Sequence, residues 1–258
     1  MVLLSSVNSQ PETIVSRSNQ IASVRSQVSP WLTPLAYSLG CWVVLPSFFR
    51  IRITGQENVP GNGPVILAPT HRSRWDALLV PYAVGRFVTG RDIRFMVTSD
   101  EMNGFQGWLI RHLGGFPVNP RNPAIASLRY GVEVLQNQEM LVIFPEGGIF
   151  RDQELHHLKP GLARLALQAE SSQSDLGVKI VPIHLDYSDP VPKWGCQVNI
   201  HIGEPLAVAD YKQGNAKRDA QRLTVDLEKA LQGLTDRHPD FVLNDAQSLS
   251  ADESPALN

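Results

Sequence analysis

The 258-residue sequence has only two cysteines, Cys41 and Cys196, and neither belongs to a C-x2-C pair. Two thiols cannot make a disulfide framework, and without paired cysteines or a histidine-rich cluster we expect no zinc site. We therefore expect two unpaired thiols in a reducing compartment. An excess of either charge is also lacking, because 23 Lys and Arg residues stand against 25 Asp and Glu residues. This balance argues against nucleic acid as a partner.

Both ends of the chain lack the pattern of a folded domain. Residues 1–29 have no periodic apolar face and lack the basic start, apolar core and cleavage site of a secretory signal. We expect them to form a disordered lead. Residues 239–258 contain four acidic residues and no Lys or Arg. We therefore expect a disordered acidic tail over residues 236–258.

A segment without charges precedes the folded part. From Trp31 to Phe49, 13 of 19 positions are apolar, and two prolines and a glycine interrupt the run (Pro34, Gly40 and Pro46). A spanning helix needs about 20 mostly apolar residues, so the length is barely sufficient. Tryptophan and tyrosine favour a bilayer interface. We predict that residues 30–50 form two short helices in a membrane interface, broken near a proline, with a buried core hairpin as the alternative.

Short apolar runs alternate with helical patterns over the rest of the chain. We expect strands at 64–69, 93–98, 140–144, 178–183 and 198–202. We expect helices at 75–87, before Gly114, at 124–136, at 161–169 and through Leu223–Leu234. This alternation predicts one α/β domain over residues 51–235, with a single mixed, mostly parallel sheet covered by helices.

The loop after the strand at 64–69 contains His71 and Asp76. Ligands of open α/β sheets bind where strands end. Residues five apart do not share a helix face, so the two side chains meet only if His71 lies in the turn and Asp76 in the first helical turn. The carboxylate then binds one imidazole nitrogen and leaves the other free to take a proton. A capping aspartate beside an incidental histidine is the alternative.

The strand at 140–144 also runs into a polar turn, which begins Pro145-Glu146-Gly147-Gly148. Glycines let backbone N–H groups approach a ligand closely. Glu146 has a carboxylate that binds a hydroxyl or a cation, while Arg151 and Lys159 add positive charge downstream. A tight turn with solvated charges is the alternative. The sequence contains no Gly-x-Ser-x-Gly elbow, which argues against a serine hydrolase.

Four short blocks follow one another in a fixed order. They are His71-x4-Asp76, Gly114-Gly115-Phe116-Pro117-Val118, Phe144-Pro145-Glu146-Gly147 and Val181-Pro182-Ile183. Together they resemble the glycerolipid acyltransferase family that includes the 1-acylglycerol-3-phosphate acyltransferases. The resemblance extends over about 51–205, which is most of the expected domain.

The resemblance implies transfer of a fatty acyl group from a thioester, on coenzyme A or acyl carrier protein, to the free hydroxyl of lysophosphatidic acid. It implies His71 as general base and Asp76 as its orienting partner, with no cofactor. Thioesters are already activated, so no metal is required. Glu146 and Gly147 would help to hold the glycerophosphate acceptor. Backbone N–H groups near the start of the helix after His71 are candidate donors to the oxyanion.

Phosphate on the acceptor would be met by Arg121, with Arg151 or Lys159 as further candidates. Both arginines are displaced from the family pattern, since Arg121 comes one position late after Val118 and Arg151 follows two extra residues. These departures leave open another lysolipid or glycolipid acceptor, or a non-catalytic lipid-binding protein on the same scaffold. A lysophospholipid substrate lies in a bilayer, so we expect membrane association at the cytoplasmic face.

Overall fold

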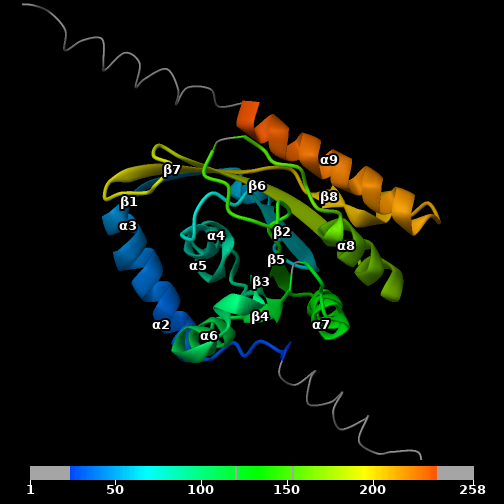
Figure 1. Cartoon of the computed structure of the whole chain (residues 1–258), viewed down its shortest axis with the longest axis horizontal. Helices are drawn as coiled ribbons and strands as arrows, with labels where there is room; N and C mark the ends of the chain where they lie inside the picture. The colour runs from blue at the N-terminus through cyan, green and yellow to red at the C-terminus, as the bar shows by residue number, and fades with distance from the viewer. Residues whose placement is uncertain (1–23, 120, 153, 237–258) are drawn as a thin grey trace, which may run out of the picture.

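The computed structural model describes residues 24–119, 121–152 and 154–236 (Figure 1). Its centre is one eight-stranded sheet in the order β1-β7-β6-β2-β5-β3-β4, with the short β8 beside β6. The strands are β1 (Phe49–Thr54), β2 (Val65–Pro69), β3 (Ile93–Thr98), β4 (Gly115–Val118), β5 (Met140–Val142), β6 (Lys179–Tyr187), β7 (Cys196–Ile202) and β8 (Leu206–Ala207). Neighbours are parallel except where β6 meets β7 and β8. The predicted mixed, mostly parallel sheet is confirmed.

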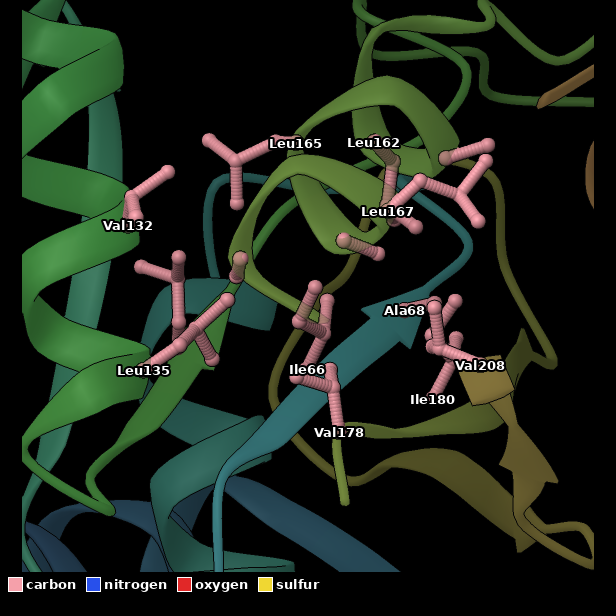
Figure 2. Packing of buried hydrophobic residues seen from close by; sticks show 14 of the residues in the cluster. Ile66, Ala68, Val132, Leu135, Leu162, Leu165, Leu167, Val178, Ile180 and Val208 are labelled. Carbon is pink, nitrogen blue, oxygen red and sulfur yellow. The ribbon is translucent and has the colours of Figure 1, made fainter. Parts of the chain in front are cut away.

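Helices cover both faces of this sheet (Figure 1). They are α2 (Leu32–Leu39), α3 (Leu45–Phe48), α4 (Asp76–Val84), α5 (Arg86–Thr89), α6 (Gly104–His112), α7 (Ile125–Gln136), α8 (Gly161–Ser172) and α9 (Ala216–Asp236). Strand β2 is buried along its whole length, and its residues alternate between the two faces. Ile66 and Ala68 pack under α7 and α8, as Figure 2 shows, whereas Val65 and Leu67 pack toward α4. Burial on both faces explains the continuous apolar run.

The helix expected at 75–87 is two helices, because the chain breaks at Gly85. This residue has extended backbone angles between α4 and α5. A Cβ atom there would lie 2.5 Å from the carbonyl oxygen of Pro81 and 2.7 Å from the ring of Tyr37. Only glycine fits this contact between α4 and the N-terminal segment. The edge strands β1 and β4 were not expected. Strand β4 has only four residues, whereas the six residues of β1 alternate between apolar and polar side chains, a strand pattern that was overlooked.

Two short α-helices, α2 and α3, form within residues 30–50 as predicted, but the predicted break between them is absent, because the helical run is continuous from Leu32 to Phe48. A π-helical stretch, Gly40–Val44, joins α2 to α3. Proline has no N–H and clashes with the carbonyl four residues earlier. A wider π-helical stretch before Pro46 relieves this conflict without ending the helix. Among the described residues, no helix is both long and apolar enough to cross a membrane.

Part of the predicted disordered lead is ordered. Residues 1–23 of the predicted lead and residues 237–258 of the predicted tail lie outside the described part of the chain. Within the described part, the N–H of Gln27 donates to the carbonyl of Arg111 over 2.9 Å, and that of Ser29 to the carbonyl of His112 over 3.0 Å. Those carbonyls end α6, where a helix has no partners of its own for its last C=O groups. The chain before α2 therefore caps α6.

Two histidines face each other across the antiparallel strands β6 and β7. His184 pairs with His201, and their rings are 6.4 Å apart. His184 is buried beside Thr235 of α9, with 3.5 Å between Nδ1 and the hydroxyl. Burial, with a smaller contribution from the Arg72 charge and from His201, lowers the pKa of His184 to about 3. His184 is therefore neutral in the folded protein near pH 7.

We predict that His184→Gln reduces the acid sensitivity of folding. Between about pH 6.5 and about pH 3 the unfolded chain protonates this histidine and the folded chain does not, so the free energy of unfolding falls as pH falls. One such group contributes a slope of up to about 1.4 kcal/mol per pH unit. Urea titrations at about pH 7 and pH 4.5 measure the difference. His157→Gln, which changes an exposed histidine, is the control, and equal acid losses in both variants would contradict the prediction.

Candidate active site

The turn between β2 and α4 brings His71 against Asp76. Nδ1 of His71 lies 2.9 Å from Oδ2 of Asp76. The aspartate opens α4 and its side chain is fully buried, whereas the His71 side chain is 18% exposed. The pair meets because the histidine precedes the helix, as the five-residue spacing requires. A buried carboxylate that accepts from Nδ1 leaves Nε2 as the nitrogen with a free lone pair.

The backbone after His71 is occupied by the same carboxylate. The N–H groups of Arg72 and Ser73 donate to Oδ2 of Asp76 over 2.7 and 2.9 Å. The hydroxyl of Tyr187 donates to Oδ1. The two backbone groups are among those expected to stabilise an oxyanion. These two groups precede α4 and hold the carboxylate of Asp76, while an oxyanion role for other N–H groups near the start of α4 stays a prediction.

Phe144 lies flat against the imidazole. The two ring centroids are 3.9 Å apart, with 19° between the ring planes. Phe144 follows β5, the strand beside β2, and the N–H of Phe150 in the same loop donates to the carbonyl of His71 over 2.8 Å. The loop after β5 therefore fixes both the ring plane and the backbone of the histidine.

Glu146 is part of the loop framework. Both of its oxygens lie 3.0 Å from Nη1 of Arg72. It also accepts from the backbone N–H of His71 over 2.8 Å and of His156 over 3.1 Å. Its side chain is fully buried. The carboxylate therefore joins the loops after β2 and β5, and the expectation that Glu146 helps to hold the acceptor stays a prediction.

Gly147 and Lys159 lie together on this loop. Gly147 has a φ of +71°, which favours glycine, and a Cβ there would be 2.6 Å from Nζ of Lys159. The ammonium lies 3.5 Å from the carbonyl oxygen of Gly147. The lysine is therefore positioned over the glycine turn, where it adds one positive charge.

Arg151 and Arg121, the two predicted phosphate ligands, lie at different places. Arg151 lines a small pocket between the loop after β5 and the end of β6, with Arg72, Asp152, His184, Leu185, Asp186, Tyr187 and Pro190. Arg121 follows β4, which is three strands from β2 in the sheet. At about 4.8 Å per strand this is roughly 14 Å. Arg151 therefore lines the pocket, and the residues that line it do not include Arg121.

Sequence reasoning missed Tyr187 and the buried role of Arg72. Tyr187 continues the alternation of Ile183 and Leu185 on β6, so its side chain lies on the face of the sheet that packs toward α4. A polar-tipped residue at the end of an otherwise apolar strand is the signal that could have identified it. Across the described ranges, no three His, Cys, Asp or Glu side chains are grouped to hold a metal ion.

Comparison with known proteins finds acyltransferases named for two acceptors, 1-acyl-sn-glycerol-3-phosphate and glycerol-3-phosphate. One of the latter, glycerol-3-phosphate O-acyltransferase 1 of Saccharomyces cerevisiae, is 34% identical over 109 residues, which is 40% of this chain and 14% of the relative. The chain is 28% identical over 156 residues to a 1-acyl-sn-glycerol-3-phosphate acyltransferase of Streptococcus pneumoniae, covering 58% of this chain and 53% of the relative. It therefore spans about half the length of that relative. A Bacillus subtilis protein with the same name is 24% identical over 201 residues, which is 76% of this chain and 93% of the relative.

A solved structure shares the fold. It is the 1-acyl-sn-glycerophosphate (LPA) acyltransferase of Thermotoga maritima, with a TM-score of 0.58 and 18% identity, over 95% of this chain and 86% of that one. Residues 50–186 match the family described as Acyltransferase. The resemblance inferred from the four sequence blocks is confirmed. Because this match covers more than half of the sequence, the chain belongs to the acyltransferase family.

Proposed function

We propose that this chain transfers a fatty acyl group from a thioester, on coenzyme A or acyl carrier protein, to the free hydroxyl of lysophosphatidic acid. The product is phosphatidic acid. The observation that carries the proposal is the hydrogen bond between Nδ1 of His71 and Asp76, because it leaves Nε2 to accept a proton. The names of the relatives from S. pneumoniae and B. subtilis support the choice of acceptor.

The proposed reaction needs only one proton carrier. Nε2 of His71 accepts the hydroxyl proton while the acceptor oxygen attacks the thioester carbonyl. The buried charge of Asp76 stabilises the imidazolium that forms. When the intermediate collapses, the C–S bond breaks and His71 returns its proton to the thiolate. General-base help of this kind is worth about 10²–10⁴-fold in rate.

The acceptor phosphate is proposed to bind near Arg151 and Lys159. Arg151 lines a pocket together with Arg72 and Tyr187, which both donate hydrogen bonds to Asp76. Lys159 covers the Gly147 turn. A guanidinium binds a phosphate through two parallel hydrogen bonds, whereas an ammonium acts as a point charge. Arg121 lies toward β4, so a longer headgroup remains a second candidate acceptor, as another lysophospholipid or a glycolipid.

The N-terminal helix is proposed to rest on a membrane interface, with the site at the cytoplasmic face. One side of it exposes large apolar residues at helical spacing, Trp31, Leu35, Leu39 and Trp42. The two tryptophans are 66% and 72% exposed. The end of the helix adjoins the site, because Phe48 stacks on Trp75 at 5.0 Å and Trp75 precedes Asp76. A lysophospholipid in the interface would thus meet the dyad.

We predict that His71→Gln lowers the initial rate of acyl transfer to lysophosphatidic acid at least about 100-fold, because the general base is lost. Purified full-length protein is assayed with both thioester donors and with a panel of lysolipids and glycolipids. His112→Gln on α6, outside the site, is the control. Full activity of a folded His71→Gln variant contradicts the mechanism. A wild-type protein that transfers to no acceptor supports the non-catalytic alternative.

The ion pair between Arg72 and Glu146 generates a stability prediction. Both partners are buried, so Glu146→Gln leaves an uncompensated guanidinium and is expected to lower the free energy of unfolding by about 3–5 kcal/mol. Arg72→Met with Glu146→Leu removes both charges and is expected to cost less than either single charge loss. Chemical denaturation of the single and double variants measures the coupling. The cycle is closed with the single variants Arg72→Met and Glu146→Leu, and a double-variant loss equal to the sum of these two single losses would contradict the coupling.

We predict that Trp31→Ser with Trp42→Ser weakens binding to anionic lipid vesicles at least about tenfold, since burying one large apolar side chain is worth about 1.5–3 kcal/mol. Vesicle co-sedimentation of the full chain measures the change. Ile125→Ser on α7, where the side chain is 69% exposed, is the matched control. Equal binding by the double variant and the wild type would exclude this helix as the anchor.

A further inference from the structure

The two oxygens of the Asp76 carboxylate have different partners. Oδ2 accepts the imidazole of His71 and the N–H groups of Arg72 and Ser73. Oδ1 accepts the hydroxyl of Tyr187, which lies 111 residues later in the chain. Because the carboxylate is fully buried, a donor to Oδ1 has to come from the protein itself. An oxygen of a buried anion that lacks such a donor is costly.

The sheet fixes the hydroxyl of Tyr187 in this place. The residue ends β6, where its backbone pairs with Val198 of β7. Its ring packs edge-on against Phe49 of β1, with centroids 6.3 Å apart and planes at 70°. Tyr187 is 5% exposed. The donor to Oδ1 therefore sits on the strand framework, whereas the donors to Oδ2 belong to the turn that contains His71.

The surroundings keep the phenol protonated. Burial, followed by the negative charge of Asp76, raises the pKa of Tyr187 far above its ordinary range. The side chain of Ser73 and the thiol of Cys196 are the other polar groups acting on the phenol. On the opposite side of the carboxylate lie His71 and then the ion pair of Arg72.

We propose that Tyr187 is a positioning residue of the candidate site, whose hydroxyl holds Oδ1 of Asp76 so that Oδ2 stays directed at Nδ1 of His71. The proposal rests on the acyl-transfer function above for its catalytic consequence. Tyr187 touches no reacting atom in this role. It acts through Asp76, by fixing the plane of the carboxylate and by favouring its charged form.

Tyr187→Phe tests the role because it keeps the ring against Phe49 and removes only the hydroxyl. With Oδ1 unpaired, the carboxylate is less well held and the dyad takes up a proton more readily. A hydrogen bond to a charged group is worth about 1.5–3 kcal/mol, so kcat is expected to fall about 10- to 100-fold. The acid limb of the kcat/KM profile is expected to move to higher pH.

Tyr130→Phe is the matched control. Tyr130 is also buried, and its hydroxyl bonds to that of Ser26 over 2.8 Å, away from the dyad. This variant is expected to lose stability without a change in kcat or in the pH profile. If Tyr187→Phe gives the wild-type pH profile, or affects only thermal stability as Tyr130→Phe does, the proposal is overturned.

A second measurement needs no substrate. The titration of the His71 ring protons is followed by NMR, with the resonance assigned from His71→Gln. Its midpoint is expected to move to higher pH in Tyr187→Phe and to stay constant in Tyr130→Phe. If the His71 midpoint moves in a protein that performs no acyl transfer, the proposed function is refuted but the coupling of Tyr187 to His71 through Asp76 is kept. An unmoved midpoint refutes the coupling whatever the activity.

A third variant covers the case in which Tyr187→Phe does not fold. Tyr187→3-fluorotyrosine keeps the hydroxyl and nearly the same ring volume, and its more acidic phenol donates a stronger hydrogen bond to Asp76. The His71 midpoint is then expected to move to lower pH, opposite to the effect of removing the hydroxyl. A midpoint that does not change, or that moves to higher pH, overturns the proposal.

Discussion

The carboxylate of Asp76 is a negative charge without access to water, and the local structure is organised by the need to match it with donors. Its partners come from the turn after β2 and from the end of β6. A charge in this position is tolerated only when nearly every lone pair is engaged. The same requirement orients the imidazole of His71, because the ring nitrogen is one of the required donors. Burial of one anion thus determines how the general base of the proposed reaction is directed.

A second buried carboxylate, that of Glu146, organises the loop after the neighbouring strand β5 in the same way. It binds the guanidinium of Arg72 and the backbone of His71 and His156. Since β2 and β5 are neighbours in the sheet, the two loops lie side by side, and this anion joins them. The glycine-bearing turn is therefore held beside the dyad, and Arg151 and Lys159 of the same loop are the cations proposed above to bind the acceptor phosphate.

The sequence predicted what depends on local pattern. The apolar runs at 64–69 and 178–183 predicted two central strands because both faces of them are covered. The spacing of His71 and Asp76 predicted their contact because a short turn brings them together. Burial of Glu146 was not predictable, since spacing does not show which side of a loop faces the interior. The contact between Tyr187 and Asp76 was not predicted either. It depends on the order of strands in the sheet, which a single sequence does not specify.

The cap on α6 has a mechanical consequence. Gln27 and Ser29 are tied to the last carbonyls of α6, Thr33 donates to the carbonyl of His112, and Tyr37 packs at the bend between α4 and α5. The aromatic helix is thereby anchored at its root and again at mid-length. The helix is not connected to the domain by a flexible linker. Its orientation relative to the sheet is set when the domain folds. A force on Trp31 or Trp42 is therefore transmitted directly to the domain that contains His71 and Asp76.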